Sequence, residues 1–488
     1  MKFAGVKHRL KRMAERAFTF NPVTLKELRQ LVRTKVITSA IVIYPLLLFM
    51  VTSAIVSGKM NHAVATHASV QSVTMGPELL GVAAAILAFL TCIVFPVFSG
   101  LRMADEAVKS KMDLQFITAL RPIDIVGGKM AATFLVSLVF AGITAPFMVF
   151  AYMLHGITLM QLGGTFAAIL VVSAVSSAIA VSIGSPSQAS VIMRKLRIFG
   201  LYACVSVYFL IGEAALIFGH GVRVASPPDM IVVVYALLFA AVMIVLARGF
   251  AASVLTPPHA DYIGPVRRAE TLFFVVVSAI ILTMAAKGAP EGAITPFVVV
   301  LSGVAVLACW RAMFTPPGMS RVSAAKAPRS LVARLLAFPF ASSAESGVVY
   351  SLIFGVAVVV VSSVACDLGS YDADVVKFAF VFFSEMTLPP FILAFVMRGV
   401  GARKWIYRYG IAIAFGWVAL MQMASILEAV GAIHESESMY GNFAGMIDRH
   451  SQVTHLNYAF FSMLAMAVLA LAFALPAFRS YRSKARKQ

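Results

Sequence analysis

Acidic side chains inside long apolar segments are the residues of this chain that could do chemistry. Glu213 and Glu385 each lie within a predicted membrane span, where an ionisable group is costly and is a functional candidate by default. Pro389 and Pro390 follow Glu385 closely, and prolines that interrupt spans can mark a transport pathway. These four residues form a candidate pathway. The alternative is that the acids make structural hydrogen bonds between packed helices.

The sequence has no motif for binding a nucleotide or for hydrolysing a bond. Gly127-Gly128-Lys129 is followed by Met130 and lacks the upstream glycine and the Ser or Thr of a phosphate-binding loop. The patterns H-E-x-x-H, G-x-S-x-G and C-x-x-C are absent as well. We therefore predict no catalytic residue, no metal site and no cofactor bound by this chain, which is not expected to be an enzyme. If ATP and Mg²⁺ are used, they bind to a partner chain.

Composition places these residues in a membrane protein. The 488 residues are 60% hydrophobic and 12% charged, whereas a soluble domain is about half apolar and a quarter charged. We predict an all-α, polytopic transmembrane bundle with no ion pair inside its spans. About twelve apolar segments are long enough to cross a bilayer, approximately 36–57, 79–100, 129–154, 161–183, 198–219, 229–247, 270–286, 294–310, 346–365, 377–397, 409–430 and 457–478.

The distribution of positive charge predicts the orientation of these spans. With the N-terminus inside, 35 of the 40 Lys and Arg residues fall in interior segments, as the positive-inside rule requires. The exterior residues are Lys59, Arg223, Lys287, Lys377 and Arg449. Both termini are then cytoplasmic. The net charge of +19 is a topology signal, and no nucleic-acid partner is expected.

Residues 1–35 are predicted to form two interfacial helices. The first, residues 1–20, has an apolar stripe with basic residues off it, which is typical of a helix in the inner membrane interface. The second begins at Asn21 and Pro22, since Asn is a good N-cap and Pro is tolerated at the first helical position. It carries on one side the apolar residues Leu25, Leu28, Leu31 and Val32.

The stretch 101–129 is predicted to be a cytoplasmic helical loop. Its apolar face suits insertion into a groove on a soluble partner; the alternative is that the loop packs against its own bundle. We expect this helix to end at Arg121-Pro122, a short turn to begin at Pro122, and Gly127-Gly128 to let the chain enter the third span. The apolar face comprises Met112, Leu114, Phe116, Ile117 and Leu120.

Two runs resemble the permease subunits of ABC transporters of the type-2 exporter family. The run from Asn21 to Gln30 looks like the N-terminal elbow helix of that family. The run from Glu106 to Lys129 resembles the segment between its second and third spans, with an acid, an apolar run, a Thr, a Pro and Gly-Lys opening the third span. The resemblance covers about residues 20–183.

The resemblance implies a coupling helix that docks on a separate ATPase chain, which holds the ATP and Mg²⁺. It also implies a second permease copy or paralogue, and a multi-pass location in a bacterial inner membrane. The elbow residues would be Asn21, Pro22, Lys26, Glu27 and Arg29, and the docking residues would be Glu106, Asp113, Leu114, Phe116, Thr118 and Pro122.

We therefore expect three regions and one activity. Residues 1–35 form the elbow helices, 36–247 a type-2 permease-like core of about six spans with the coupling loop 101–129, and 248–488 an additional membrane region of about six spans. The expected activity is ATP-driven export. The alternative is an ion- or proton-coupled secondary transporter that uses Glu213 and Glu385.

Overall fold

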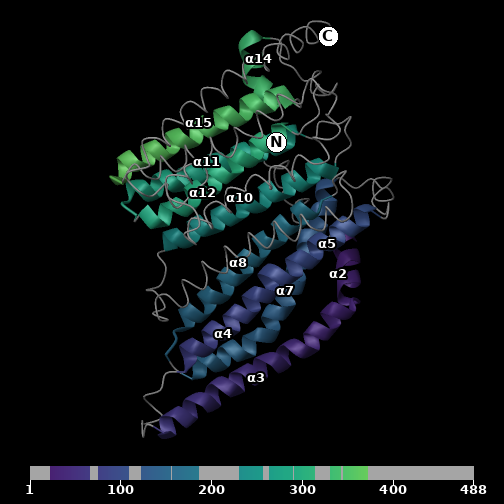
Figure 1. Ribbon diagram of the computed structural model, residues 1–488, viewed down its shortest axis with the longest axis vertical. Coiled ribbons are helices and arrows are strands. Elements are labelled where there is room, and N and C mark those ends of the chain that lie inside the picture. Colours follow the sequence, from purple (N-terminus) through teal and green to yellow (C-terminus); the bar gives the residue numbers. More distant parts are fainter. Residues whose placement is uncertain are drawn as a thin grey trace, which may run out of the picture. The chain divides into compact units, whose positions relative to one another are not determined.

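The computed structural model divides the chain into two compact units, unit 1 (Met1–Leu255) and unit 2 (Thr256–Gln488). Figure 1 shows the helices that make up each unit. Every regular element among the described residues is a helix. The structure describes residues 22–65, 75–108, 122–154, 156–185, 230–255, 263–289, 291–313, 330–341 and 344–371.

Unit 1 consists of a short helix and a group of long apolar ones. The short helix α2 precedes α3 and is turned across its direction (Figure 1). Thr158 caps α8: its hydroxyl oxygen accepts a hydrogen bond from the Gln161 amide at 3.3 Å, and the Gln161 side chain accepts one from the Thr158 amide at 2.8 Å. The described elements are α2 (Pro22–Val32), α3 (Lys35–Ala65), α4 (Gly76–Ala88), the π-helix η2 (Phe89–Val94), α5 (Phe95–Val108), α7 (Pro122–Met153), α8 (Leu159–Gly184) and α10 (Met230–Leu255).

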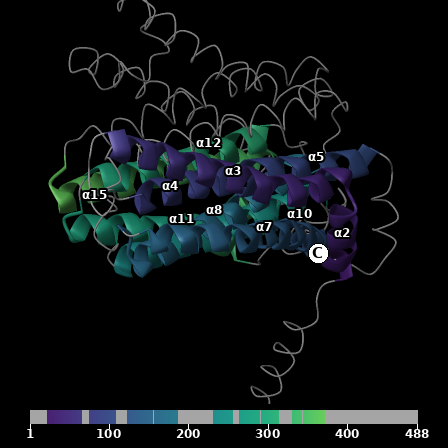
Figure 2. The same ribbon diagram turned by 90° about the horizontal axis from the view of Figure 1, so that it is seen from below.

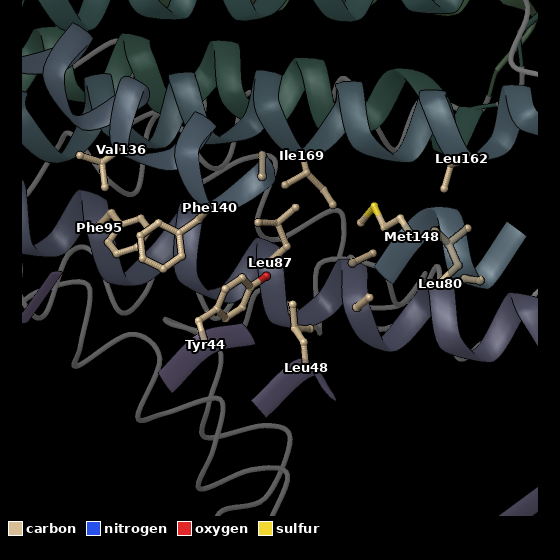
Figure 3. Close-up of a cluster of buried hydrophobic side chains, with 14 of the residues drawn as sticks. Tyr44, Leu48, Leu80, Leu87, Phe95, Val136, Phe140, Met148, Leu162 and Ile169 are labelled. Carbon is tan, nitrogen blue, oxygen red and sulfur yellow. The ribbon is translucent and has the colours of Figure 1, made fainter. Parts of the chain in front are cut away.

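Aromatic and aliphatic side chains from α3, α4, α7 and α8 form the core of unit 1 (Figure 3). Phe140 lies at its centre, with ring centroids 5.4 Å from Tyr44 and 4.6 Å from Phe95. The Tyr44 hydroxyl is 2.6 Å from the Thr144 hydroxyl. This contact satisfies the polar tip of a buried ring, as burial of a tyrosine requires.

The part of unit 2 that the structure describes contains three long helices and a short segment between the second and third of them. The elements are α11 (Gly264–Ala286), α12 (Glu291–Met313), α14 (Leu331–Ala337), the 3₁₀ turn η3 (Phe338–Phe340) and α15 (Ala344–Gly369). Helices α11 and α12 form a hairpin, and α15 packs against both. The Phe274 and Phe354 rings meet edge to face at 5.0 Å between α11 and α15.

Seven described helices are long and apolar enough to cross a membrane, and the described residues therefore have the architecture of a multi-pass membrane protein. They match seven of the predicted spans; the prediction at 294–310 falls on a shorter apolar helix, Ile294–Cys309. The predicted spans 198–219, 377–397, 409–430 and 457–478 lie outside the described residues.

The predicted start of the third span is wrong. Helix α7 begins at Pro122 rather than at 129 and runs for 32 residues, so Pro122 opens the spanning helix and no separate turn follows it. Pro is well suited to the first helical position, because the amide hydrogen it lacks would have no partner within the helix. Gly127 and Gly128 consequently lie inside a helix, not in a linker.

Candidate functional site

Five helices of unit 1 meet at one end, which we call the charged end. It comprises α2, the last turns of α5, α8 and α10, and the first turns of α7. The loop predicted to dock on a partner joins α5 to α7, so the charged end holds both of its roots. Figure 2 shows α2 lying across this end of the long helices.

A buried ion pair fastens α2 to the start of α7. The Lys129 ammonium donates to Glu27 Oε1 at 2.6 Å, and the two side chains are only 4% and 5% exposed. Arg102 of α5 lies 3.9 Å from Glu27 Oε2 and donates to the Gln30 side chain at 3.0 Å. The carboxylate therefore faces cations from both roots of the loop, which offsets the cost of burying its charge.

The packing of α2 is steric as well as ionic. Val23, Thr24, Glu27 and Leu31 form its buried face, and Val23 lies against Gly128 of α7. A Cβ added at Gly128 would stand 2.8 Å from Val23 Cβ, a separation that side chains cannot adopt. Glycine at this position is what lets the two helices approach so closely.

Two of the four apolar residues predicted for one side of α2, Leu28 and Leu31, pack against the core, and the other two face outward. Leu25 and Val32 are 43% and 49% exposed, whereas the charged residue Glu27 is 4% exposed. The helix is rotated so that its carboxylate reaches Lys129. The buried face of α2 therefore combines the apolar residues Val23 and Leu31 with a carboxylate whose partner lies 102 positions away in the sequence.

Helix α10 holds the first turn of α7 through Arg248. The Arg248 Nε donates to the Ile123 carbonyl at 3.2 Å, and its Nη2 lies 3.9 Å from Asp124. The Ser182 hydroxyl of α8 donates to the Ala247 carbonyl at 2.7 Å, which fixes α10 to α8. The start of α7 is thus held by α2 through Lys129 and by α10 through its own main chain.

Helix α5, the other root of the loop, packs closely on α8 and α7. Gly184 is so near the Gly100 backbone that an added Cβ would overlap it. The Thr133 hydroxyl of α7 donates to the Ser99 hydroxyl at 2.7 Å. Close contact through small residues and buried hydroxyl bonds is the usual way in which membrane helices associate.

The second predicted span contains a π-helical turn, η2, six residues before Gly100. The Thr91 carbonyl in η2 accepts a hydrogen bond from the Ser173 hydroxyl of α8 at 3.2 Å. The Thr91 hydroxyl donates to the Leu87 carbonyl at 2.9 Å. π-Helical turns in α-helices occur frequently at functional sites, and this one lies in the helix that leads to the loop.

The structure describes part of the predicted site. Pro22 is the first residue of α2, Pro122 is the first residue of α7, and Glu106 lies in the last turn of α5. Lys26 and Arg29 are exposed on α2, and Glu27 is buried. The remaining predicted site residues lie outside the described part of the chain: Asn21, Asp113, Leu114, Phe116, Thr118, Glu213, Glu385, Pro389 and Pro390.

Sequence reasoning missed the cations at the charged end. Arg102 and Lys129 were expected at the two ends of the cytoplasmic helical loop 101–129, and no ion pair was predicted for either of them. Lys129 is followed directly by a long apolar run, and a lysine at the start of such a run is the signal that could have shown it pairing with an acid.

A second buried charged cluster lies in unit 2, on α11 and α12. Arg311 donates to Glu270 at 2.5 and 2.7 Å through its two terminal nitrogens. Arg267, only 1% exposed, donates to the Pro339 carbonyl at 2.6 Å and to the Ser346 hydroxyl at 2.9 Å, and it also bonds the Ala341 carbonyl. It holds η3 and the start of α15 against α11.

Neither charged cluster has the composition of a metal centre. No group of three His, Cys, Asp or Glu side chains within the described ranges could hold a metal ion. The described ion pairs of Glu27 and Glu270 are with Lys and Arg side chains, which cannot ligate a metal ion as cations. Comparison of the chain with protein-family models, with curated proteins and with solved structures finds no match.

Proposed function

We propose that this chain is the membrane-spanning permease subunit of an ATP-driven ABC exporter. Its coupling loop, 101–129, would dock on a separate ATPase chain. The observation that carries the proposal is the buried Glu27–Lys129 pair, which joins a short helix before the first span to the root of the loop predicted to dock. A loop that must transmit force needs roots that move as one body.

The helices that leave the loop reach across unit 1 without a break. On one side the run Gly76–Asp105 is 30 residues long, and on the other α7 is 32 residues long. At about 1.5 Å per residue each exceeds the thickness of a bilayer core. Displacement of the loop would therefore be carried across the membrane by α7, and by α5 as far as η2.

The π-helical turn η2 gives this transmission a place to bend. Its extra residue loosens the main-chain hydrogen-bond ladder of the second span, and Ser173 of α8 supplies a replacement donor for the Thr91 carbonyl. A helix that bends at η2 can shift its loop end while α4 stays packed in the core. Such a shift between two packings is the general logic of alternating access.

The charged end is proposed to be cytoplasmic. Within unit 1 it bears Arg29, Arg33, Arg102 and Arg248, whereas Lys59 lies near the opposite end of α3. Positively charged residues are retained on the cytoplasmic side, so α2 takes the place of an elbow helix at the inner interface. ATP and Mg²⁺ would bind the ATPase subunit, and a second permease copy or paralogue would complete the pathway.

Docking is tested by changing Leu114 and Phe116 together to Asp. The full chain is co-expressed with a candidate ATP-binding cassette ATPase, and co-purification and ATPase stimulation are measured. We expect at least a tenfold loss of both, because two carboxylates would enter an apolar groove. The matched control changes Leu159 and Met160 to Asp; these exposed apolar residues of α8 lie away from the charged end, and the control should keep both signals.

Retention of ATPase binding and stimulation by the Leu114→Asp, Phe116→Asp variant would sink the docking role. The alternative, an ion- or proton-coupled transporter, makes the opposite prediction. It requires transport in liposomes without any ATPase and loss of that transport in Glu385→Gln. The two readings therefore differ in one measurement, substrate movement in the absence of ATP.

A further inference from the structure

The outer face of α2 is cationic. Lys26 and Arg29 are exposed on it, Arg33 is exposed in the turn that leads to α3, and Lys35 is the exposed first residue of α3. Positions 26, 29 and 33 are three and four residues apart and so lie on one side of a helix. Four cations therefore gather beside the first residues of a predicted span.

No acid balances this charge within the described stretch from Pro22 to Lys35. Its single carboxylate, Glu27, lies on the opposite face of α2 and is paired with Lys129 at 2.6 Å. The ion pair that docks α2 on α7 thereby removes the one internal counter-charge. The outer face can only be neutralised by something outside α2.

The turn between α2 and α3 fixes the direction of this face. The Thr34 hydroxyl donates to the Leu31 carbonyl at 2.6 Å, and the Thr34 amide donates to the same carbonyl at 3.0 Å. The amide of Ile37 then donates to the Thr34 carbonyl at 3.1 Å. The apolar span begins at Ile37, so the four cations lie within about 15 residues of the hydrocarbon boundary, at the depth of lipid headgroups.

We propose that the outer face of α2 binds the headgroups of anionic phospholipids in the leaflet beside it. Two exposed apolar side chains, Leu25 and Val32, lie on the same face as Arg29 and suit insertion between acyl chains. Basic residues mixed with apolar ones on a helix that precedes a span are typical of a lipid-binding surface. A dock for an acidic protein would not need these apolar side chains.

The test uses the full chain in a neutral detergent, titrated with short-chain phosphatidylglycerol or phosphatidylcholine while thermal unfolding is followed. The unchanged protein should be stabilised by phosphatidylglycerol alone. Arg29→Gln with Arg33→Gln should weaken the apparent affinity for phosphatidylglycerol about tenfold, since each surface cation contributes measurably to attraction by anionic lipid. Arg29→Lys with Arg33→Lys should keep the affinity, because charge and not shape is recognised.

The control is Lys287→Gln, which removes an exposed cation elsewhere and should leave the affinity unchanged. Unfolding temperatures measured in phosphatidylcholine show whether each variant is folded, so a loss of lipid response is separable from a loss of structure. An unchanged affinity in Arg29→Gln, Arg33→Gln would overturn the proposal. So would a variant that keeps its lipid response and loses only the ATPase subunit, which would make the face a protein dock.

Discussion

In each unit a buried charged side chain holds a short helical segment against a spanning helix. In unit 1 both the short helix and the spanning helix contribute a charged side chain, whereas in unit 2 only the spanning helix does. In unit 1 the short helix supplies the carboxylate of Glu27 and the spanning helix supplies Lys129. In unit 2 the spanning helix supplies Arg267, and the short segment supplies only the main-chain oxygens of Pro339 and Ala341. One contact depends on side-chain identity in the docked segment and the other on its backbone shape.

This difference determines what a second substitution can repair. Two side chains that neutralise each other can both be replaced by neutral groups, and such replacements of buried ion pairs are often tolerated. Main-chain carbonyls cannot be replaced, so the loss of their donor has no complement. The docking of α2 should therefore be rescuable, whereas the docking of η3 should not be.

The largest effect is expected for Arg267→Leu. The change leaves the buried Pro339 carbonyl without its described donor and takes one of two donors from the Ala341 carbonyl, which keeps the Ser346 hydroxyl at 2.7 Å. A buried group left unsatisfied costs about 1–3 kcal/mol, and the packing of the long Arg267 side chain is lost as well. We expect the free energy of unfolding in mixed micelles to fall by about 3–5 kcal/mol.

The control for this change is Arg268→Leu, whose exposed side chain bonds only the Gly264 carbonyl of its own helix in the hydrogen bonds described. It should lower the free energy of unfolding by less than about 1 kcal/mol. Equal losses of unfolding free energy in Arg267→Leu and Arg268→Leu would mean that the Arg267 contacts do not hold η3. The proposed difference between the two units would then be wrong for unit 2.

A smaller loss of unfolding free energy is expected for Lys129→Met, and a second substitution should restore most of it. The change leaves the Glu27 carboxylate buried with Arg102 at 3.9 Å as its remaining described cation, so we expect a loss at the lower end of the usual range, about 3 kcal/mol. Adding Glu27→Gln removes the buried charge and should recover all but about 1 kcal/mol.

The measurement is a double-mutant cycle on the free energy of unfolding, with hydrogen exchange of the 22–32 peptide as a local readout. Lys129→Met should raise the exchange rate of α2, and the double variant should restore it. Losses that simply add would show that the two side chains act independently, which is incompatible with a docking pair.

The helices of both units were largely predictable, whereas the contacts that place the short segments were not. Apolar runs longer than a bilayer is thick identify α3, α7 and α8, because no other structure accommodates them. Glu27 could not be placed, since its partner is 102 positions away. Arg267 binds the main-chain carbonyls of Pro339 and Ala341. Because every residue has such a carbonyl, the side chains of that segment do not reveal the contact.

The smallest expected effect concerns the steric part of α2 docking. Gly128→Ala places a Cβ 2.8 Å from Val23 Cβ and 3.2 Å from the Thr24 amide nitrogen, and we expect the free energy of unfolding to fall by about 1–2 kcal/mol as α2 is pushed outward.

Gly142→Ala in the same helix is the control: an added Cβ there has no neighbour within 4 Å, and alanine favours helix. Because the displacement also lengthens the Lys129–Glu27 contact, the exchange rate of the 22–32 peptide should rise in Gly128→Ala and not in Gly142→Ala. Unchanged exchange in both variants would show that the Glu27–Lys129 ion pair alone holds α2 on α7. The close packing of Val23 on Gly128 would then contribute nothing to the docking of α2.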